Sequence, residues 1–288
     1  MVYGVLRFIN FAHSDVFMAG AFAGYYMSRG FEFTLPGMHK KALFIFKGLP
    51  QESFLAGSFV LLGSMAICAF LGILIERFAY RPLRNSSKLN VLITAIGVSL
   101  LLENLAQALF GATPKAFPPL LPSKSIHLGP LLVSTNQIGV LLITFVLMMA
   151  LQYIVRRTKM GTAMRAVSFN PTAASLVGVN NDVIISFTFG LGSALAAAGG
   201  ILYALNYQSI DPLMGVLPGL KAFVAAVLGG IGNIPGAALG GLVLGLVETF
   251  VNGSRFSSYT DAIAFAILIL ILLFRPEGLL GKSQVEKV

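Results

Sequence analysis

Residues 54–75 read FLAGSFVLLGSMAICAFLGILI, a run of 22 residues without a charged side chain. A helix needs about 20 consecutive apolar residues to cross the hydrocarbon core of a bilayer, so this stretch predicts a transmembrane helix. The rest of the chain has the same character, because 56% of its 288 residues are hydrophobic and only 11% are charged. A soluble domain carries about 25% charged residues. We therefore predict an all-α, polytopic transmembrane helical bundle, which excludes most classes of soluble enzyme.

Four further segments are apolar enough to be expected as spans. They are Leu89–Phe110, Ile138–Val155, Val183–Leu205 and Ala262–Phe274. The last one reaches the length of a span only if Tyr259, Thr260 and Asp261 extend it. Near the start of the chain, Val16–Met27 offers only 12 residues for a helix. We expect this first helix to be truncated at its N-terminal side.

The distribution of basic residues predicts the orientation of the chain in the membrane. Residues 76–88, residues 156–182 and the tail after Phe274 hold four, four and three of the 20 basic residues. Cytoplasmic loops collect Lys and Arg, so these segments are placed in the cytoplasm and residues 111–137 and 206–215 outside. The net charge of +9 then reflects topology rather than nucleic-acid binding. Residues 28–53 disagree, because parity places them outside although they carry four basic residues.

Residues 222–251 predict a broken or re-entrant pair of helices. Parity requires an even number of crossings, yet as one helix these 30 residues would be about 45 Å long, too long for one span and short for two. The centre of the segment, Gly229-Gly-Ile-Gly-Asn-Ile-Pro-Gly236, has the composition of a turn. Non-helical backbone at membrane depth persists only where it is buried in protein or faces a water-filled cavity. We therefore expect the break to border a pathway; two short, tightly packed spans are the alternative.

Polar and ionisable side chains at membrane depth are functional candidates, because they are costly in lipid. We assign the translocation pathway to Asn10, His13, Asp15, Glu103, Glu248, Gly232 and Asn233. A structural explanation competes with each carboxyl group. Asp15 lies near a helix end, where hydration satisfies it, and Glu103 and Glu248 are each able to pair with a basic or amide side chain.

The loop at residues 156–182 contains the signals of a short helix. Asn170 suits the N-cap, Pro171 suits the first helical position, and Gly178 suits the left-handed position after the last turn. These residues predict a helix over Pro171–Val177 with an apolar and small surface. Such a helix either connects two spans or docks into a groove of a cytoplasmic partner.

No pattern for catalysis or cofactor binding stands out. Pro276–Ser283 is similar to a Walker A loop, but Pro276 occupies the position of the required first glycine. One cysteine and three histidines give no metal-ligand spacing. We therefore expect no enzyme activity, no metal and no cofactor in this chain.

Several motifs resemble a known family. Ala173-Ala-Ser-Leu-Val-Gly178 resembles the EAA-type coupling segment of ABC importer permeases. Ile9-Asn-Phe-Ala-His13, Glu76-Arg-Phe-Ala-Tyr-Arg-Pro-Leu-Arg84, the segment from Gly219 to Gly236 and Arg275-Pro-Glu-Gly278 are more specific. They resemble branched-chain amino-acid ABC transporter permeases, and the LivH-type subunit most closely.

The resemblance implies a single transmembrane permease domain over residues 1–288, with a cytoplasmic coupling loop at 156–182. Its partners would be a second related permease, two cytoplasmic ATPases that hold ATP and Mg²⁺, and a periplasmic binding protein, all at the bacterial inner membrane. The coupling residues would be Asn170, Pro171, Ala173, Ala174, Gly178 and Arg165. Branched-chain amino acids are the first choice of substrate, with urea, short amides or other amino acids as alternatives. A secondary transporter or channel is the rival class.

Overall fold

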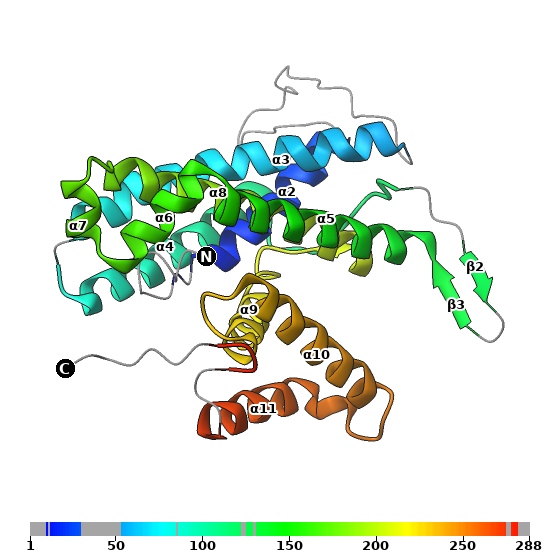
Figure 1. Cartoon of the computed structure of the whole chain (residues 1–288). Coiled ribbons are helices and arrows are strands. Elements are labelled where there is room, and N and C mark those ends of the chain that lie inside the picture. The colour runs from blue at the N-terminus through cyan, green and yellow to red at the C-terminus, as the bar shows by residue number, and fades with distance from the viewer. Residues whose placement is uncertain are drawn as a thin grey trace, which may run out of the picture. The chain divides into compact units, whose positions relative to one another are not determined.

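The computed structural model describes residues 10, 12–29, 53–84, 86–121, 125–128, 131–274 and 278–281, most of which are helical (Figure 1). The helices are α2 (His13–Arg29), α3 (Phe54–Ile75), α4 (Lys88–Phe110), α5 (Thr135–Arg157), α6 (Lys159–Phe169), α7 (Pro171–Leu176), α8 (Asn181–Tyr207), α9 (Val216–Gly229), α10 (Ile234–Asn252) and α11 (Thr260–Phe274). A π-helical turn, η1 (Glu76–Tyr80), and a 3₁₀ turn, η2 (Arg81–Leu83), continue α3, and the 3₁₀ turn η3 (Ser257–Tyr259) precedes α11. Two small antiparallel sheets pair β1 (Lys115–Ala116) with β4 (Ser209–Ile210) and β2 (Ser125–Leu128) with β3 (Leu131–Ser134). The prediction of an all-α bundle is confirmed, with strands confined to loops.

Five helical segments among the described residues are long and apolar enough to cross a membrane. They are Phe54–Leu83, Leu89–Phe110, Thr135–Arg157, Asn181–Tyr207 and Ile234–Asn252. Four of them coincide with predicted spans. The fifth predicted span is α11, which includes Thr260 and Asp261 as expected, but its 15 residues are only about 22 Å long. Helix α10 instead reaches spanning length, with 19 residues.

The chain divides into two compact units. The first unit combines Asn10–Leu147 with Asp182–Gly215, and the second contains Met148–Asn181 and Val216–Val288. Each unit is therefore described by itself. The expectation of a single permease domain stays a prediction.

Helix α2 packs against α3 and α8 at the centre of the first unit. A Cβ atom at Gly20 would lie 2.3 Å from the Cα atom of Ala197, and one at Gly200 would lie 2.1 Å from the carbonyl oxygen of Phe17. A Cβ atom at Gly24 would lie 3.0 Å from Ile201, and Cys68 on α3 lies beside the carbonyl of Val16. Small residues let helix backbones approach this closely. Gly200 thus serves the packing of α8 against α2.

In the first unit, a basic loop lies at one end of α8, and loops poor in basic residues lie at the other. At its first turn, Asp182 pairs with Arg81 and Arg84 of the basic segment 76–88. After its last turn, β4 pairs with β1, and Lys115 donates a hydrogen bond to the hydroxyl of Tyr26 (2.9 Å). Loops poor in basic residues thus meet at one end and basic loops at the other, in agreement with the predicted orientation. The discordant segment 28–53 lies mostly outside the described residues.

The second unit contains the predicted broken pair of helices. Helix α9 ends at Gly229 and α10 begins at Ile234, so the predicted break is confirmed. The first helix begins earlier than expected, at Val216, because Pro218 falls in its first turn, where a missing N–H group is tolerated. A Cβ atom at Gly240 would lie 2.1 Å from the carbonyl oxygen of Ala225, so the two helix backbones are in direct contact. Whether the break borders a pathway stays a prediction.

The contact between α2 and α8 makes a stability prediction. Gly20→Ala places a methyl group inside the backbone of α8, and overpacking of this kind costs about 1–3 kcal/mol. We expect a lower melting temperature and a lower yield of monodisperse, detergent-solubilised protein. Gly97→Ala on α4 is the matched control, because a Cβ atom there meets nothing within 4 Å. Equal melting temperatures for the two variants would contradict the packing described.

Candidate functional site

The short helix predicted over Pro171–Val177 is present as α7. The Asn170 side chain accepts a hydrogen bond from the backbone N–H of Ala173 (3.0 Å), and Pro171 is the first helical residue. At the other end, the backbone N–H groups of Gly178 and Val179 donate to the carbonyls of Ser175 and Ala174. This pair of bonds is the Schellman arrangement, and it requires the left-handed backbone that Gly178 adopts (φ 87°). The cap signals read from the sequence are confirmed; the helix ends at Leu176, one residue earlier than predicted.

A second helix, α6, precedes α7 in the same loop and was not predicted. Thr158 caps it by accepting a hydrogen bond from the backbone N–H of Gly161 (3.1 Å). Arg165 on α6 donates to the carbonyl of Val155, near the end of α5, and to the hydroxyl of Thr162 (3.2 Å). Arg165 thus ties α6 to the end of α5, and its role toward an ATPase stays a prediction.

Large apolar side chains are exposed at both ends of α7. Phe169 is 87% exposed just before it, and Leu176 is 83% exposed at its end, followed by the exposed Val177. Ala174, in contrast, is buried on the inner face of the helix, while Ala173 is exposed. Exposed apolar residues in a basic, polar loop are typical of a protein interface.

Three of the predicted pathway residues meet in a polar cluster around the start of α2. Asp15 is 1% exposed, and its carboxylate accepts a hydrogen bond from the hydroxyl of Ser99 on α4 (2.5 Å). Glu103 lies one helical turn beyond Ser99, on the same face of α4, and interacts electrostatically with Asp15. Asn10 accepts a hydrogen bond from the hydroxyl of Tyr80 (2.6 Å), and Tyr80 also interacts electrostatically with Asp15.

The remaining pathway residue of this unit, His13, is half-buried, and its backbone N–H donates to the carbonyl of Asn10 (3.2 Å). The non-helical segment after β4 reaches the same place. A Cβ atom at Gly215 would lie 2.1 Å from the carbonyl oxygen of Ser14 and 3.6 Å from the backbone nitrogen of Asp15. Irregular backbone therefore packs directly against the first turn of α2, next to a buried carboxyl group.

The other predicted pathway residues lie in the second unit and have structural partners there. Glu248 on α10 forms an ion pair with Lys221 on α9 (3.1 Å), and Lys221 also pairs with Asp261 on α11 (2.8 Å). Sequence reasoning left Lys221 out of the site. A lone lysine in an apolar helix is a usable signal, because it requires an acidic partner at membrane depth.

Asn233 and Gly232 lie in the break between α9 and α10. The Asn233 side chain caps α10 through the backbone N–H of Gly236 (3.3 Å) and donates to the carbonyl of Leu280 (2.9 Å). Gly232 has a left-handed backbone (φ 92°) and open space where a Cβ atom would lie. These contacts hold the break together, and the pathway role of both residues stays a prediction.

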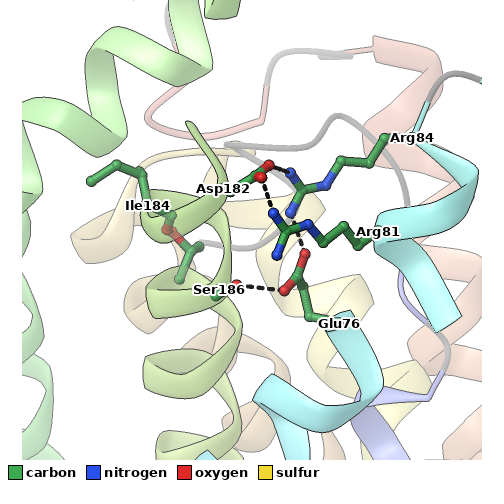
Figure 2. Close-up of polar contacts among 7 residues, drawn as sticks. Glu76, Arg81, Arg84, Asp182, Ile184 and Ser186 are labelled. Atoms are coloured by element: carbon green, nitrogen blue, oxygen red, sulfur yellow. Dashed lines mark hydrogen bonds and ion pairs between the residues drawn. The ribbon is translucent and has the colours of Figure 1, made fainter. Parts of the chain in front are cut away.

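A charge network joins the end of α3 to the start of α8 (Figure 2). Figure 2 shows Arg81 and Arg84 reaching from the cyan segment toward Asp182 on the green helix, with Glu76 beneath them. Glu76 is 0% exposed, and it accepts hydrogen bonds from Arg84 and from the hydroxyl of Ser186. Arg84 also bonds to Asp182, which accepts a further bond from Arg81. Sequence reasoning used this segment for the orientation of the chain and for the family resemblance, but did not predict the network.

No group of three or more His, Cys, Asp or Glu residues that could hold a metal ion occurs within the part of the chain that the structure describes. Half of the Walker-like segment 276–283 lies outside that part, as do most of residues 1–11 and the family motif at 275–278 apart from Gly278.

Comparison with known proteins agrees with this architecture. Residues 1–272 match the family described as the permease component of branched-chain amino acid transport systems. Among similar proteins, the High-affinity branched-chain amino acid transport system permease protein LivH of Salmonella typhimurium strain LT2 is 39% identical, over 100% of this chain and 90% of its own length. The corresponding BraD protein of Pseudomonas aeruginosa strain PAO1 is 40% identical, over 100% of this chain and 91% of its own. LivH of Escherichia coli K12 is 40% identical, over 100% and 90%.

No solved structure matches the chain significantly. The family match covers nearly the whole chain, and the similarity to LivH and BraD proteins extends over all of it. The resemblance seen in the sequence motifs is therefore confirmed. The chain belongs to the family of permease components of branched-chain amino acid transport systems.

Proposed function

We propose that this chain is a transmembrane permease subunit of an ABC importer that moves branched-chain amino acids into the cytoplasm. Family membership and the names of the LivH and BraD relatives support the substrate class. Five apolar helices long enough to cross a membrane support a multi-pass membrane protein, placed by this proposal in the bacterial inner membrane. The single observation that carries the proposal is α7, a helix capped at both ends that presents exposed apolar side chains within a basic loop.

The geometry of α7 suits a joint with an ATPase. A helix of six residues has little stability alone, because helix nucleation is costly. The Asn170 cap and the Gly178 turn fix both ends, and Ala174 is buried on its inner face. The exposed Leu176 and Val177 are then free to fill an apolar groove in a partner. ATP binding and hydrolysis with Mg²⁺ would occur on two partner ATPases, and this chain would hydrolyse nothing.

The polar cluster at the start of α2 is the proposed section of the pathway in this chain. A buried carboxyl group persists in a membrane protein where it is paired or faces an aqueous path. Asp15 has a hydrogen bond from Ser99 and a second carboxyl group, Glu103, nearby. Carboxylates there would attract the ammonium group of an amino acid. A second related permease and a periplasmic binding protein would complete the importer. The binding protein would determine most of the substrate specificity.

Uptake by the assembled complex tests this function. The chain, co-expressed with its partner subunits, is expected to co-purify with two ATPases and, in proteoliposomes with the binding protein, to import leucine, isoleucine or valine. Vanadate should stop import, because it traps the ATPases. Uptake that survives vanadate but collapses with a protonophore would show a secondary transporter and overturn the proposal. Import of urea or short amides alone would change the substrate class only.

The cap at Gly178 makes a separate prediction for coupling. Gly178→Val forces a β-branched residue into a left-handed backbone, a strain of about 1–3 kcal/mol. Since a Cβ atom there meets nothing within 4 Å, the backbone strain alone should unwind the end of α7. We expect normal membrane insertion, weaker co-purification of the ATPases and reduced uptake. Gly178→Asn is the control, because asparagine tolerates this backbone. Wild-type uptake by Gly178→Val would refute the coupling role.

A further inference from the structure

The first turn of α8 is attached to the end of α3 at two points. Asp182 accepts bonds from Arg81 and Arg84, which follow α3 in the η2 turn and just after it. Ser186, four residues later on the same face of α8, donates to Glu76 (2.5 Å), the first residue of η1. Arg84 links the two points, because it bonds to both Asp182 and Glu76.

The charges of this network balance. Two arginines face two carboxylates, and Glu76 is completely buried while the Arg84 side chain is only 20% exposed. Removing one partner from such a network leaves an unpaired buried charge, which is strongly unfavourable. Asp182 and Arg81 are more exposed, at 43% and 41%, so the network runs from the surface into the protein. The two helix ends are thus held by a contact that resists separation.

The α8–α3 contact continues below the network as tight packing. A Cβ atom at Gly72 would lie 2.0 Å from the hydroxyl of Ser193, and one at Gly190 would lie 3.1 Å from Ile73. The rings of Tyr80 and Phe189 pack against each other in a tilted arrangement, with their centroids 5.3 Å apart. Closely packed helices move as one body rather than sliding continuously. A displacement of the first turn of α8 therefore has to move the end of α3.

The coupling helix leads directly into this turn. Helix α7 ends at Leu176 and α8 begins at Asn181, one residue before Asp182. The Asn181 side chain donates to the carbonyl of Pro171 (2.8 Å), so the first residue of α8 holds the first residue of α7. The π-helical turn η1 continues α3 at the end that contacts α8, and such turns occur frequently at functional sites.

We propose that Asp182 is a positioning residue that transmits the movement of α7, through Arg81 and Arg84, to the cytoplasmic end of α3. This inference rests on the proposed function as an ATP-driven importer. It adds a mechanical path within the chain from the ATPase contact to a helix that packs against α2 and its buried Asp15. The predicted coupling residues and the caps of α7 end at Gly178, whereas this path depends on Asp182, Arg81 and Arg84.

The test measures amino acid imported per ATP hydrolysed by the full complex in proteoliposomes with the binding protein. Asp182→Asn keeps the size and an acceptor oxygen of the side chain but removes its charge. We expect import per ATP to fall roughly tenfold, within the range typical of coupling between sites, while ATP hydrolysis persists. Asp182→Glu should retain the wild-type ratio. Arg77→Gln is the matched control, because Arg77 is an exposed arginine in η1, beside Glu76, and is outside the network.

A double variant separates transmission from general destabilisation. If Asp182 and Arg81 act through one contact, Asp182→Asn combined with Arg81→Gln should be no worse than the stronger single variant. A wild-type ratio in Asp182→Asn, or multiplied losses in the double variant, would overturn the inference. If Asp182→Asn fails to assemble, the import per ATP of Arg81→Gln decides the question. A roughly tenfold lower value would support the inference, and a wild-type value would contradict it. Failure of the wild-type complex to import or hydrolyse ATP would instead contradict the proposed function.

Discussion

The close approach of α2 to α3 and α8 is the constraint on which the first unit depends. The backbones meet so tightly at Gly20 and Gly200 that no side-chain atom fits between them. This packing buries the start of α2 and the end of α3 together with their carboxyl groups. A buried carboxylate needs a partner. Asp15 accepts a hydrogen bond from the hydroxyl of Ser99, and Glu76 accepts hydrogen bonds from Arg84 and Ser186. Close packing thus dictates where polar networks form.

The same rule governs the second unit, where the helices are short and broken. Ends of helices leave unsatisfied backbone groups that lipid cannot satisfy. The carbonyls of Leu228 and Gly229, at the end of α9, accept bonds from the backbone N–H groups of Leu279 and Leu280. The tail residues Gly278–Gly281 therefore complete the break, and Asn233 joins both sides of it. Lys221 forms ion pairs with two carboxylates, Glu248 and Asp261, on the neighbouring helices.

Patterns that act locally could be predicted from the sequence. Apolar length predicted the spans, glycines and a proline predicted the break at 229–236, and Asn170, Pro171 and Gly178 predicted α7, since cap and turn chemistry depends on a few adjacent residues. Partners distant in sequence could not be predicted. Ser99 for Asp15, Lys221 for Glu248 and Asp182 for Arg84 lie 84, 27 and 98 positions apart, and only the packing of helices selects them. Helix α6 was missed because its 11 residues are too short for a span and include Gly161, a poor helix former.

The central claim is that the network of Glu76, Arg81, Arg84 and Asp182 holds the end of α3 and the first turn of α8 together throughout the transport cycle. The most direct measurement is the distance between spin labels at positions 77 and 183 in the assembled complex, with the buried Cys68 replaced by serine. The account predicts the same distance distribution in the resting and vanadate-trapped states, and a shift on trapping when Asp182 is replaced by asparagine. A distance that changes on trapping with Asp182 intact would contradict it.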